Sequence, residues 1–180
     1  MMLLADDAAP EGPPPLVYAA VQLGLQRAAE VILFPEPFAE TNLRILGTRY
    51  ENAFTQAPLF DPHRRAFEWD GDHWQTNTIG HGLMGAELYI HARRCHWGAP
   101  AAFAFTAVSS TAWEYLIEAN GVRPSAWDLT YTPLAGLVFG EARYQVLRAA
   151  SHIASPVWRR TLQVTMDPMG ELGMLLGSPC

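Results

Sequence analysis

Four polar residues could share one site in this chain: His81, Glu114, Glu118 and Asp128. Glu114 and Glu118 are four residues apart, which places both carboxylates on one face of a helix. Two such carboxylates repel each other unless one is protonated, paired with arginine or bound to a cation. A neutral imidazole beside a carboxylate can act as a general base, and a desolvated second carboxylate as an acid. His81, Glu114 and Asp128 are therefore the candidate catalytic residues.

The same side chains could instead bind a divalent cation or serve the fold alone. Imidazole nitrogen and carboxylate oxygen suit a hard or borderline ion, but the spacing matches no known metal motif, and the metal stays unknown. Structural roles are the commoner explanation for each residue taken singly. Asp128 fits a helix-capping pattern, Glu118 could pair with Arg123 in solvent, Glu114 could pair with an arginine, and His81 could be a core or capping histidine.

The elements that must position these residues are helices. Apolar periodicity predicts helices over residues 16–33, 40–55, 78–96, 101–119 and 132–150. Asn120-Gly121 is typical of a helix end, and Thr132-Pro133 of a helix start. Glycines beside His81, and the small-residue pair Gly136 and Gly140, allow close contact between helices. We expect a mainly α protein, a compact helical bundle with irregular loops, packed through glycine-rich faces.

Two further polar clusters point to less specific roles. His91 and Cys95 are four residues apart, but arginines interleave with them, so we expect an exposed surface. The run from Asp70 to His73 has the start of a calcium loop without the rest of it, so we expect a turn.

Composition excludes some classes of function. The chain has 180 residues, is 49% hydrophobic and 17% charged, and carries a net charge of −6. All twelve basic residues are arginine, with no basic stripe that could neutralise phosphates, so we expect no nucleic-acid partner. The first residues lack the features of a secretory leader, and residues 95–113 fit a buried or interfacial helix better than a membrane span.

The order of these segments predicts the domain organisation. Residues 1–15 are rich in proline and acidic side chains and are expected to form a disordered lead-in. The segments that follow are an N-terminal helical segment over residues 16–66, a helical core over 67–170, and a tail over 171–180.

Several ordered motifs between Phe67 and Gly170 carry a family resemblance. The matching positions are Asn77, His81, Gly85, Tyr89, Ala92, Arg93, Ser110, Trp113, Glu114, Tyr115, Pro124, Ser125, Asp128, Leu129, Thr132, Pro133, Gly136, Gly140 and Glu141. Together they resemble a bacterial family known as a domain of unknown function, DUF3943. Gly82 departs from the pattern, because a proline is usual there. A fainter similarity, in which His, Glu and Asp follow on successive helices, links the chain to VanZ-like envelope proteins.

The resemblance implies a setting without implying an activity. Relatives look secreted, and some continue into an outer-membrane barrel, so we expect the periplasm or the periphery of the outer membrane, with a membrane or envelope partner. Asn77, Tyr89, Arg93 and Glu141 match motif positions, and Glu118 follows Glu114 on one face. These five are the candidate binding residues. The resemblance does not indicate a cofactor, which stays unknown.

Two functions remain open after this reasoning. The leading one is an uncharacterised, envelope-associated helical protein with a binding or structural role at a membrane face. The alternative is a hydrolase acting on a lipid or lipid-linked substrate. In the hydrolase His81 would be the base, Glu114 or Asp128 its orienter or acid, and Glu118 a cation ligand. The sequence decides neither between these functions nor the oligomeric state.

Overall fold

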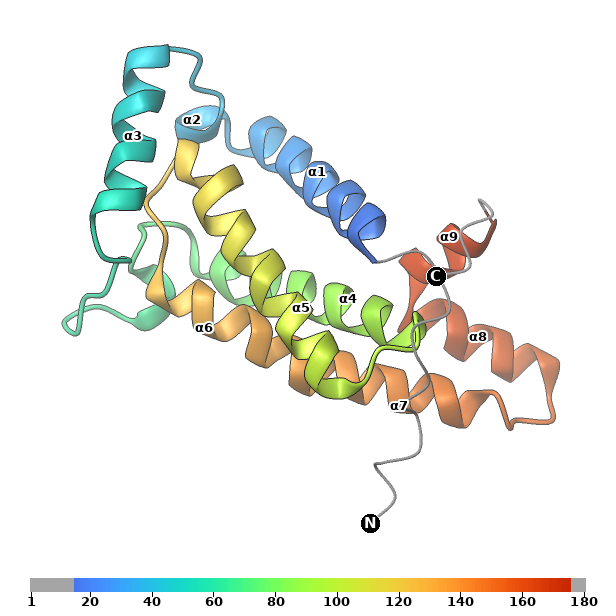
Figure 1. The fold of residues 1–180 in the computed structure, drawn as a ribbon. Coiled ribbons are helices and arrows are strands. Elements are labelled where there is room, and N and C mark those ends of the chain that lie inside the picture. Colours follow the sequence, from blue (N-terminus) through green and yellow to red (C-terminus); the bar gives the residue numbers. More distant parts are fainter. Residues whose placement is uncertain (1–14, 176–180) are drawn as a thin grey trace.

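The computed structural model describes residues 15–175, and this range is mainly α-helical (Figure 1). Within it the extended pairing is limited to an isolated bridge between Leu59 and Ser125, and no strand forms. The predicted fold class is therefore confirmed. The predicted lead-in, apart from Pro15, and the last five residues of the predicted tail lie outside the described residues.

The helices follow one another with short connections. The α-helices are α1 Leu16–Leu33, α2 Pro35–Phe38, α3 Leu43–Thr55, α4 His81–Arg94, α5 Ala99–Ala112, α6 Ala126–Ala135, α7 Glu141–Ala150, α8 Pro156–Met166 and α9 Pro168–Leu175. The 3-10 segments are η1 Ala66–Glu68 and η4 Glu118–Asn120. The π segments are η2 Thr76–Gly80, η3 Trp113–Ile117 and η5 Gly136–Gly140, which lead into or continue α4, α5 and α6.

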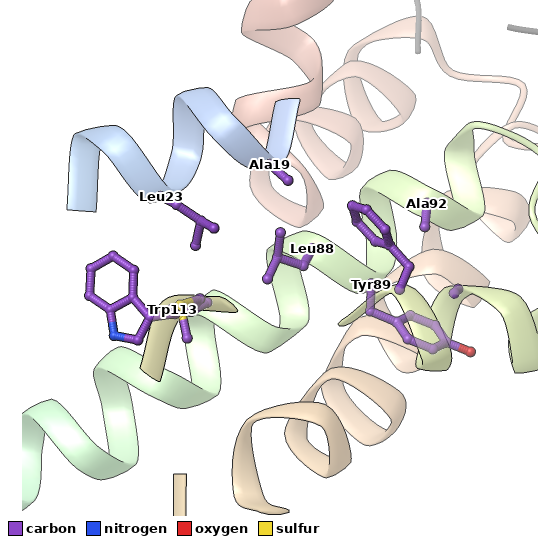
Figure 2. Close-up of a cluster of buried hydrophobic side chains, with 9 residues drawn as sticks. Ala19, Leu23, Leu88, Tyr89, Ala92 and Trp113 are labelled. Atoms are coloured by element: carbon purple, nitrogen blue, oxygen red, sulfur yellow. The ribbon is translucent and has the colours of Figure 1, made fainter. Parts of the chain in front are cut away.

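Helix α4 lies in the centre of the bundle, where α5, α6 and η5 pack against it (Figure 1). The apolar core forms where α1 and α5 meet α4. Figure 2 shows its side chains, which are Ala19, Leu23, Met84, Leu88, Tyr89, Ala92, Ala102, Phe105 and Trp113. Burying these side chains supplies the main apolar contribution to stability, at about 25 cal/mol per Å² removed from water. Helix α3 lies at one end of the molecule, and α8 and α9 lie at the other.

Close contact between α4 and the α6–η5 segment depends on glycine. A Cβ atom added at Gly85 would lie 2.0 Å from the carbonyl oxygen of Thr132, and one added at Gly136 would lie 2.7 Å from the carbonyl oxygen of Gly85. One added at Gly140 would lie 2.9 Å from the Cβ of Tyr89. The backbones approach more closely than any side chain would allow. The predicted packing through glycine-rich faces is confirmed.

The predicted helix bounds are correct for α1 and wrong in the segments from residue 78 to residue 150. The predicted 16–33 helix begins and ends as α1 does, whereas a helix start at Thr132-Pro133 is wrong. Helix α6 begins at Ala126, and Pro133 lies inside it. A proline signal is a weak local preference, and here packing against α4 overrides it. The predicted helices over 78–96 and 101–119 are likewise interrupted by π and 3-10 turns.

The predicted exposed face at His91 and Cys95 is also wrong. His91 is 5% exposed and Cys95 is 1% exposed. Helix α1 covers this face of α4, and the ring of Tyr18 stacks on the ring of His91 with centroids 3.6 Å apart. The interleaved arginines do not open the face to solvent, because Arg93 and Arg94 are themselves paired with acidic side chains.

Candidate functional site

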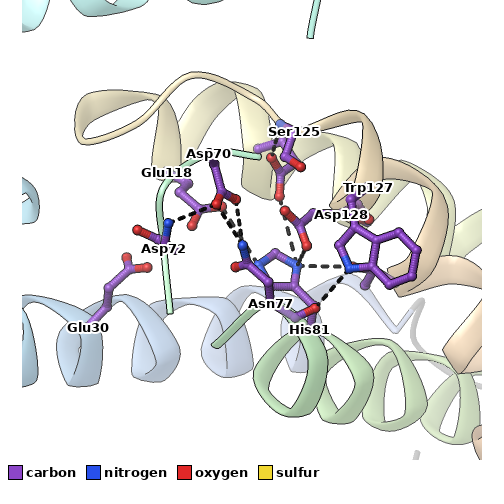
Figure 3. Close-up of polar contacts among 12 residues, drawn as sticks. Glu30, Asp70, Asp72, Asn77, His81, Glu118, Ser125, Trp127 and Asp128 are labelled. Atoms are coloured by element: carbon purple, nitrogen blue, oxygen red, sulfur yellow. Dashed lines mark hydrogen bonds and ion pairs between the residues drawn. The ribbon is translucent and has the colours of Figure 1, made fainter. Parts of the chain in front are cut away.

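His81 is the first residue of α4 and lies in a buried cluster of acidic side chains (Figure 3). Its Nδ1 atom lies 3.9 Å from Glu114 Oε1 and 3.8 Å from Asp128 Oδ1. Its Nε2 atom lies 4.0 Å from Glu118 Oε2. The exposed fraction of all four residues is 4% or less. The predicted convergence of these residues is present in the structure.

Three parts of the chain deliver the carboxylates to His81. Glu114 belongs to the π segment η3, Glu118 opens the 3-10 turn η4, and Asp128 lies in the first turn of α6. The π segment η2 ends directly before His81. A π turn changes the direction in which the following side chains project, and such turns are frequent at functional sites. Here the irregular turns aim buried polar groups at one point.

Backbone contacts hold the cluster in place. The N–H of Ser125 donates to Glu114 Oε2 at 3.0 Å, and the Ser110 hydroxyl donates to the backbone carbonyl of Asp128 at 3.4 Å. Glu114 Oε1, Glu118 Oε1 and both carboxylate oxygens of Asp128 have no partner in standard hydrogen-bond geometry within residues 15–175. The side chains of Asp70 and Ser125 lie beside the Asp128 carboxyl, and the Asp70 contact favours its protonated form.

The ordinary structural roles considered for these acids do not apply. Ser125 occupies the position before α6, yet no side-chain hydrogen bond caps that helix, and Asp128 points toward His81 instead (Figure 3). Glu118 is buried, while Arg123 donates to the side chain of Gln56. For Glu114, the basic side chain within 4 Å is the His81 imidazole rather than an arginine of the described range. Tertiary packing buries these groups, although their spacing also fits a solvated surface.

Sequence reasoning missed Asp70, Asp72 and Thr132. Both oxygens of Asp70 accept from the amide of Asn77, at 2.7 and 2.9 Å, so the predicted binding residue Asn77 joins the cluster from its edge. Asp72 lies beside this pair (Figure 3). Asp70 and Asp72 were not selected from the sequence because aspartate is also common in turns, and a turn was expected there.

The Thr132 hydroxyl lies 3.0 Å from His81 Nδ1. Thr132 stands four residues after Asp128 on one face of α6, a spacing that could have signalled it.

Burial sets the protonation states in the cluster. It lowers the pKa of His81 to about 4, so the imidazole is neutral at pH 7. Burial also raises the pKa of Glu114, and burial together with the Glu114 charge raises the pKa values of Glu118 and Asp128. The pKa of Asp72 rises to about 7 through burial and the nearby Asp70 charge. Ionised carboxylates are therefore costly here without a cation.

The other predicted binding residues form a second cluster farther along α4. The Tyr89 hydroxyl donates to Glu141 Oε2 at 2.9 Å, and Arg93 Nε donates to the same oxygen at 3.0 Å. The guanidinium of Arg93 also lies over the ring of Tyr144, 4.4 Å from its centroid. In this cluster the acid has a basic partner. The structure does not bring Tyr89, Arg93 and Glu141 into contact with His81.

A pocket of about 990 Å³ leads to the His81 cluster. It opens between α1, α2 and residues 64–80, and its inner wall includes His81, Asp72, Met84 and Trp113. Much of the remaining lining is apolar: Ala29, Leu33, Phe34, Phe38, Trp74 and Ile79. This size and mixture of apolar walls with a few polar groups are typical of small-molecule sites.

The arrangement has the groups needed for cation binding and for acid–base chemistry. A neutral imidazole and several carboxylates can coordinate a cation, and the ligand atoms of His81, Glu114 and Asp128 all lie within 4.8 Å of one another.

Comparison with known proteins supports the predicted resemblance. The model of the family described as Domain of unknown function (DUF3943) matches residues 66–169, a range that contains α4, α5, α6 and α7 and every residue of the His81 cluster. No curated protein and no solved structure matches the chain.

Proposed function

Because the chain belongs to the DUF3943 family, whose description names no activity, we propose from the structure that it is a binding protein acting at a membrane face of the cell envelope. In this proposal the outer side of α1 contacts the bilayer, and the pocket beneath α1 receives a ligand. The observation that carries the proposal is that α1 turns its apolar side outward and its polar side toward the interior of the protein. The envelope setting, in the periplasm or at the periphery of the outer membrane, comes from the family resemblance.

The outward side of α1 is entirely apolar. Its exposed residues are Leu16, Val17, Ala20, Val21, Gly24, Leu25, Ala28, Ala29, Ile32 and Leu33, of which Ala29 and Leu33 lie at the edge where this side meets the pocket. Exposure reaches 69% at Val17 and 77% at Ile32. A surface helix of a water-soluble protein turns polar residues outward, and a continuous apolar face of this kind is typical of a contact with a membrane or a partner.

The inward side of α1 carries the polar residues of the helix. The Gln22 amide donates to the backbone carbonyl of Met84 at 3.3 Å, and Arg27 pairs with Glu30 at 2.5 Å. By length and composition, α1 is the helix of the described range that could cross a membrane. Core helices and signal sequences can have the same length and composition. The argument therefore rests on which side of α1 is exposed, rather than on its hydropathy.

The α6–η5 segment repeats this reversed arrangement. Its buried positions include Asp128, Thr132 and Gly136. Its exposed residues after Thr130 are Leu134, Leu137, Val138 and Phe139. Small and polar residues inside, with apolar residues outside, are characteristic of helices that pack in an apolar medium. This second segment supports the same membrane-facing role.

Charges around the pocket favour a particular ligand class. Four acids, Glu30, Glu36, Glu68 and Asp72, and one arginine, Arg64, line it; Glu30 is neutralised by Arg27, and the other three acids still outnumber Arg64. Together with the apolar walls, this predicts an amphiphilic ligand with an apolar body and a cationic head rather than an anionic one.

Vesicle flotation tests the proposal. We expect the full chain to float with phosphatidylcholine vesicles, and the double variant Val21→Glu, Leu25→Glu to remain in the soluble fraction, because two charges would have to enter the apolar region. The matched control is Leu43→Glu, Val157→Glu, which adds the same charge at exposed apolar positions on α3 and α8. A soluble wild type, or equal loss in both double variants, would contradict the proposal.

A further inference from the structure

We propose that His81, Glu114 and Asp128 form a binding site for one divalent first-row transition-metal ion, and that Glu118 orients the His81 ring. This inference goes beyond membrane binding and does not depend on it, because it rests on the buried side chains alone. The ion would reach the site through the pocket, whose inner wall includes His81.

Unused oxygen atoms provide the first argument. Glu114 Oε1 and both carboxylate oxygens of Asp128 have no partner in standard hydrogen-bond geometry within residues 15–175, although Glu114 and Asp128 are only 2% and 1% exposed and the Asp70 and Ser125 side chains lie beside the Asp128 carboxyl. Leaving a buried charged group without a partner costs more than leaving a neutral one. Glu114 Oε1 and Asp128 Oδ1 both face His81 Nδ1, so they define a common point that a cation could occupy.

Distances between ligand atoms provide the second argument. His81 Nδ1 lies 3.9 Å from Glu114 Oε1 and 3.8 Å from Asp128 Oδ1. Metal–ligand bonds of about 2.0–2.2 Å place neighbouring ligands about 3.3 Å apart around a tetrahedral zinc ion. Closing the two His81 separations to that value requires shifts of a few tenths of an ångström in each side chain. All three ligand atoms lie within 4.8 Å of one another, so binding would draw the two carboxylates inward.

Nδ1 is the His81 nitrogen that would bind the ion, because Glu114 Oε1 and Asp128 Oδ1 both lie within 4 Å of it. Binding through Nδ1 requires the tautomer with its proton on Nε2, the nitrogen that lies 4.0 Å from Glu118 Oε2. In that tautomer the lone pair on Nδ1 accepts the Thr132 hydroxyl, whose oxygen lies 3.0 Å away. Binding exchanges this hydrogen bond for a bond to the metal. A carboxylate that orients a metal-binding histidine through its other nitrogen is a recurrent feature of metal sites.

The two carboxylate oxygens of Glu114 have different roles. Oε2 is held by the N–H of Ser125 at 3.0 Å, which leaves Oε1 directed at His81. Two ionised carboxylates would balance the charge of a divalent ion. The imidazole ligand favours a borderline ion such as Zn²⁺ over Mg²⁺ or Ca²⁺, which prefer oxygen ligands throughout.

Calorimetric titration of the chelator-treated full chain with Zn²⁺ alone, in the absence of vesicles, tests the site. We expect one ion per chain. His81→Gln and Asp128→Asn should weaken binding by more than about 100-fold, and Glu118→Gln by about 10–100-fold, the usual effect of removing an orienting partner. The matched control His63→Gln removes an exposed imidazole and should leave the affinity unchanged.

Co²⁺ provides a readout that a purely structural role would not give. We expect a visible d–d absorption band in the wild type that disappears in His81→Gln, with helical content unchanged. If His81→Gln does not fold, Asp128→Asn decides, because asparagine has nearly the shape of the protonated Asp128 side chain and should not impair folding without metal. Absence of Zn²⁺ binding to the folded wild type, unchanged binding in a folded Asp128→Asn chain, or tighter binding of Mg²⁺ or Ca²⁺ than of Zn²⁺ would overturn the proposal. None of these outcomes depends on the flotation result.

Discussion

The two ends of helix α4 differ in whether their acidic side chains have basic partners. At its start, His81 faces Glu114, Glu118 and Asp128, and among residues 15–175 no arginine lies within 4 Å of these acids. At its end, the acids have basic partners. Arg93 pairs with Glu141 at 3.0 Å, and Arg94 pairs with Asp167 at 2.5 Å and with Glu171 at 3.4 Å.

Both ends are largely buried, so the difference does not come from solvent. Arg93 is 8% exposed and His81 is 4% exposed. A buried ion pair is satisfied within the chain, whereas a buried group of acids is satisfied only by protons or by a cation from outside. The comparison separates ion pairs that stabilise the fold at the end of α4 from the proposed cation site at its start. Three substitutions can break or sharpen this contrast.

The largest effect should come from Gly85→Ala, because it damages both ends of α4 at once. The new methyl group would lie 2.0 Å from the Thr132 carbonyl oxygen and 3.1 Å from the Gly136 nitrogen, so α4 and α6 must separate. We expect the free energy of unfolding to fall by about 3 kcal/mol or more, measured by urea denaturation.

Gly47→Ala is the matched control for this substitution. Nothing lies within 4 Å of a Cβ atom at Gly47 in α3, so we expect a gain of up to about 1 kcal/mol from helix propensity. Equal stability of Gly85→Ala and the wild type would contradict the close helix packing described above.

A smaller effect, confined to the end of α4, is expected for Arg93→Met. This change leaves the Glu141 carboxylate without its guanidinium and removes the hydrogen bond from Arg93 to the Trp97 carbonyl. We expect a loss of about 3 kcal/mol or less in the free energy of unfolding, because Glu141 is partly open to solvent, with unchanged Zn²⁺ affinity. Arg148→Met, at an exposed position on α7, is the control. If Arg93→Met instead abolished Zn²⁺ binding without loss of stability, the two ends would not be separate units.

The smallest effect, at the start of α4, concerns pH. Burial and the Asp70 charge raise the pKa of Asp72 from 3.8 to about 7, so between these values the folded chain holds a proton that the unfolded chain releases. The Asp72 contribution to the free energy of unfolding is therefore complete below about pH 4 and is lost as the pH rises through 7. Asp72→Asn should be as stable as the wild type at pH 4 and more stable at pH 7.5, without metal. The shift corresponds to about 4 kcal/mol, and solvent screening of this partly buried carboxyl should reduce the difference to about 2 kcal/mol.

Urea denaturation at both pH values measures this difference, with Glu51→Gln at an exposed position of α3 as the control. A gap of the same size at pH 4 and pH 7.5 would show that the Asp72 carboxyl is not forced to hold its proton in the folded chain.

Much of the site could be predicted because its residues stand at helical spacings within ordered motifs. The repeat of four residues correctly places Glu114 and Glu118 on one face, and the glycine pairs correctly predict close helix contact. Asp70 escaped prediction because an Asp-Gly turn explains its residue type equally well. Thr132 escaped because Pro133 indicates a helix start there, whereas the helix already begins at Ala126.

Taken alone, the sequence determined the helical class, the bounds of α1 and the residue types that could meet at His81, because these follow from local periodicity and composition. Tertiary structure decided which charges are paired. Whether Glu118 meets Arg123 in water or His81 in the interior depends on how η4 and α4 pack, and no local pattern records that choice. It also decided that α1 turns its apolar side outward, since periodicity defines a helix face but not the direction in which the bundle presents it.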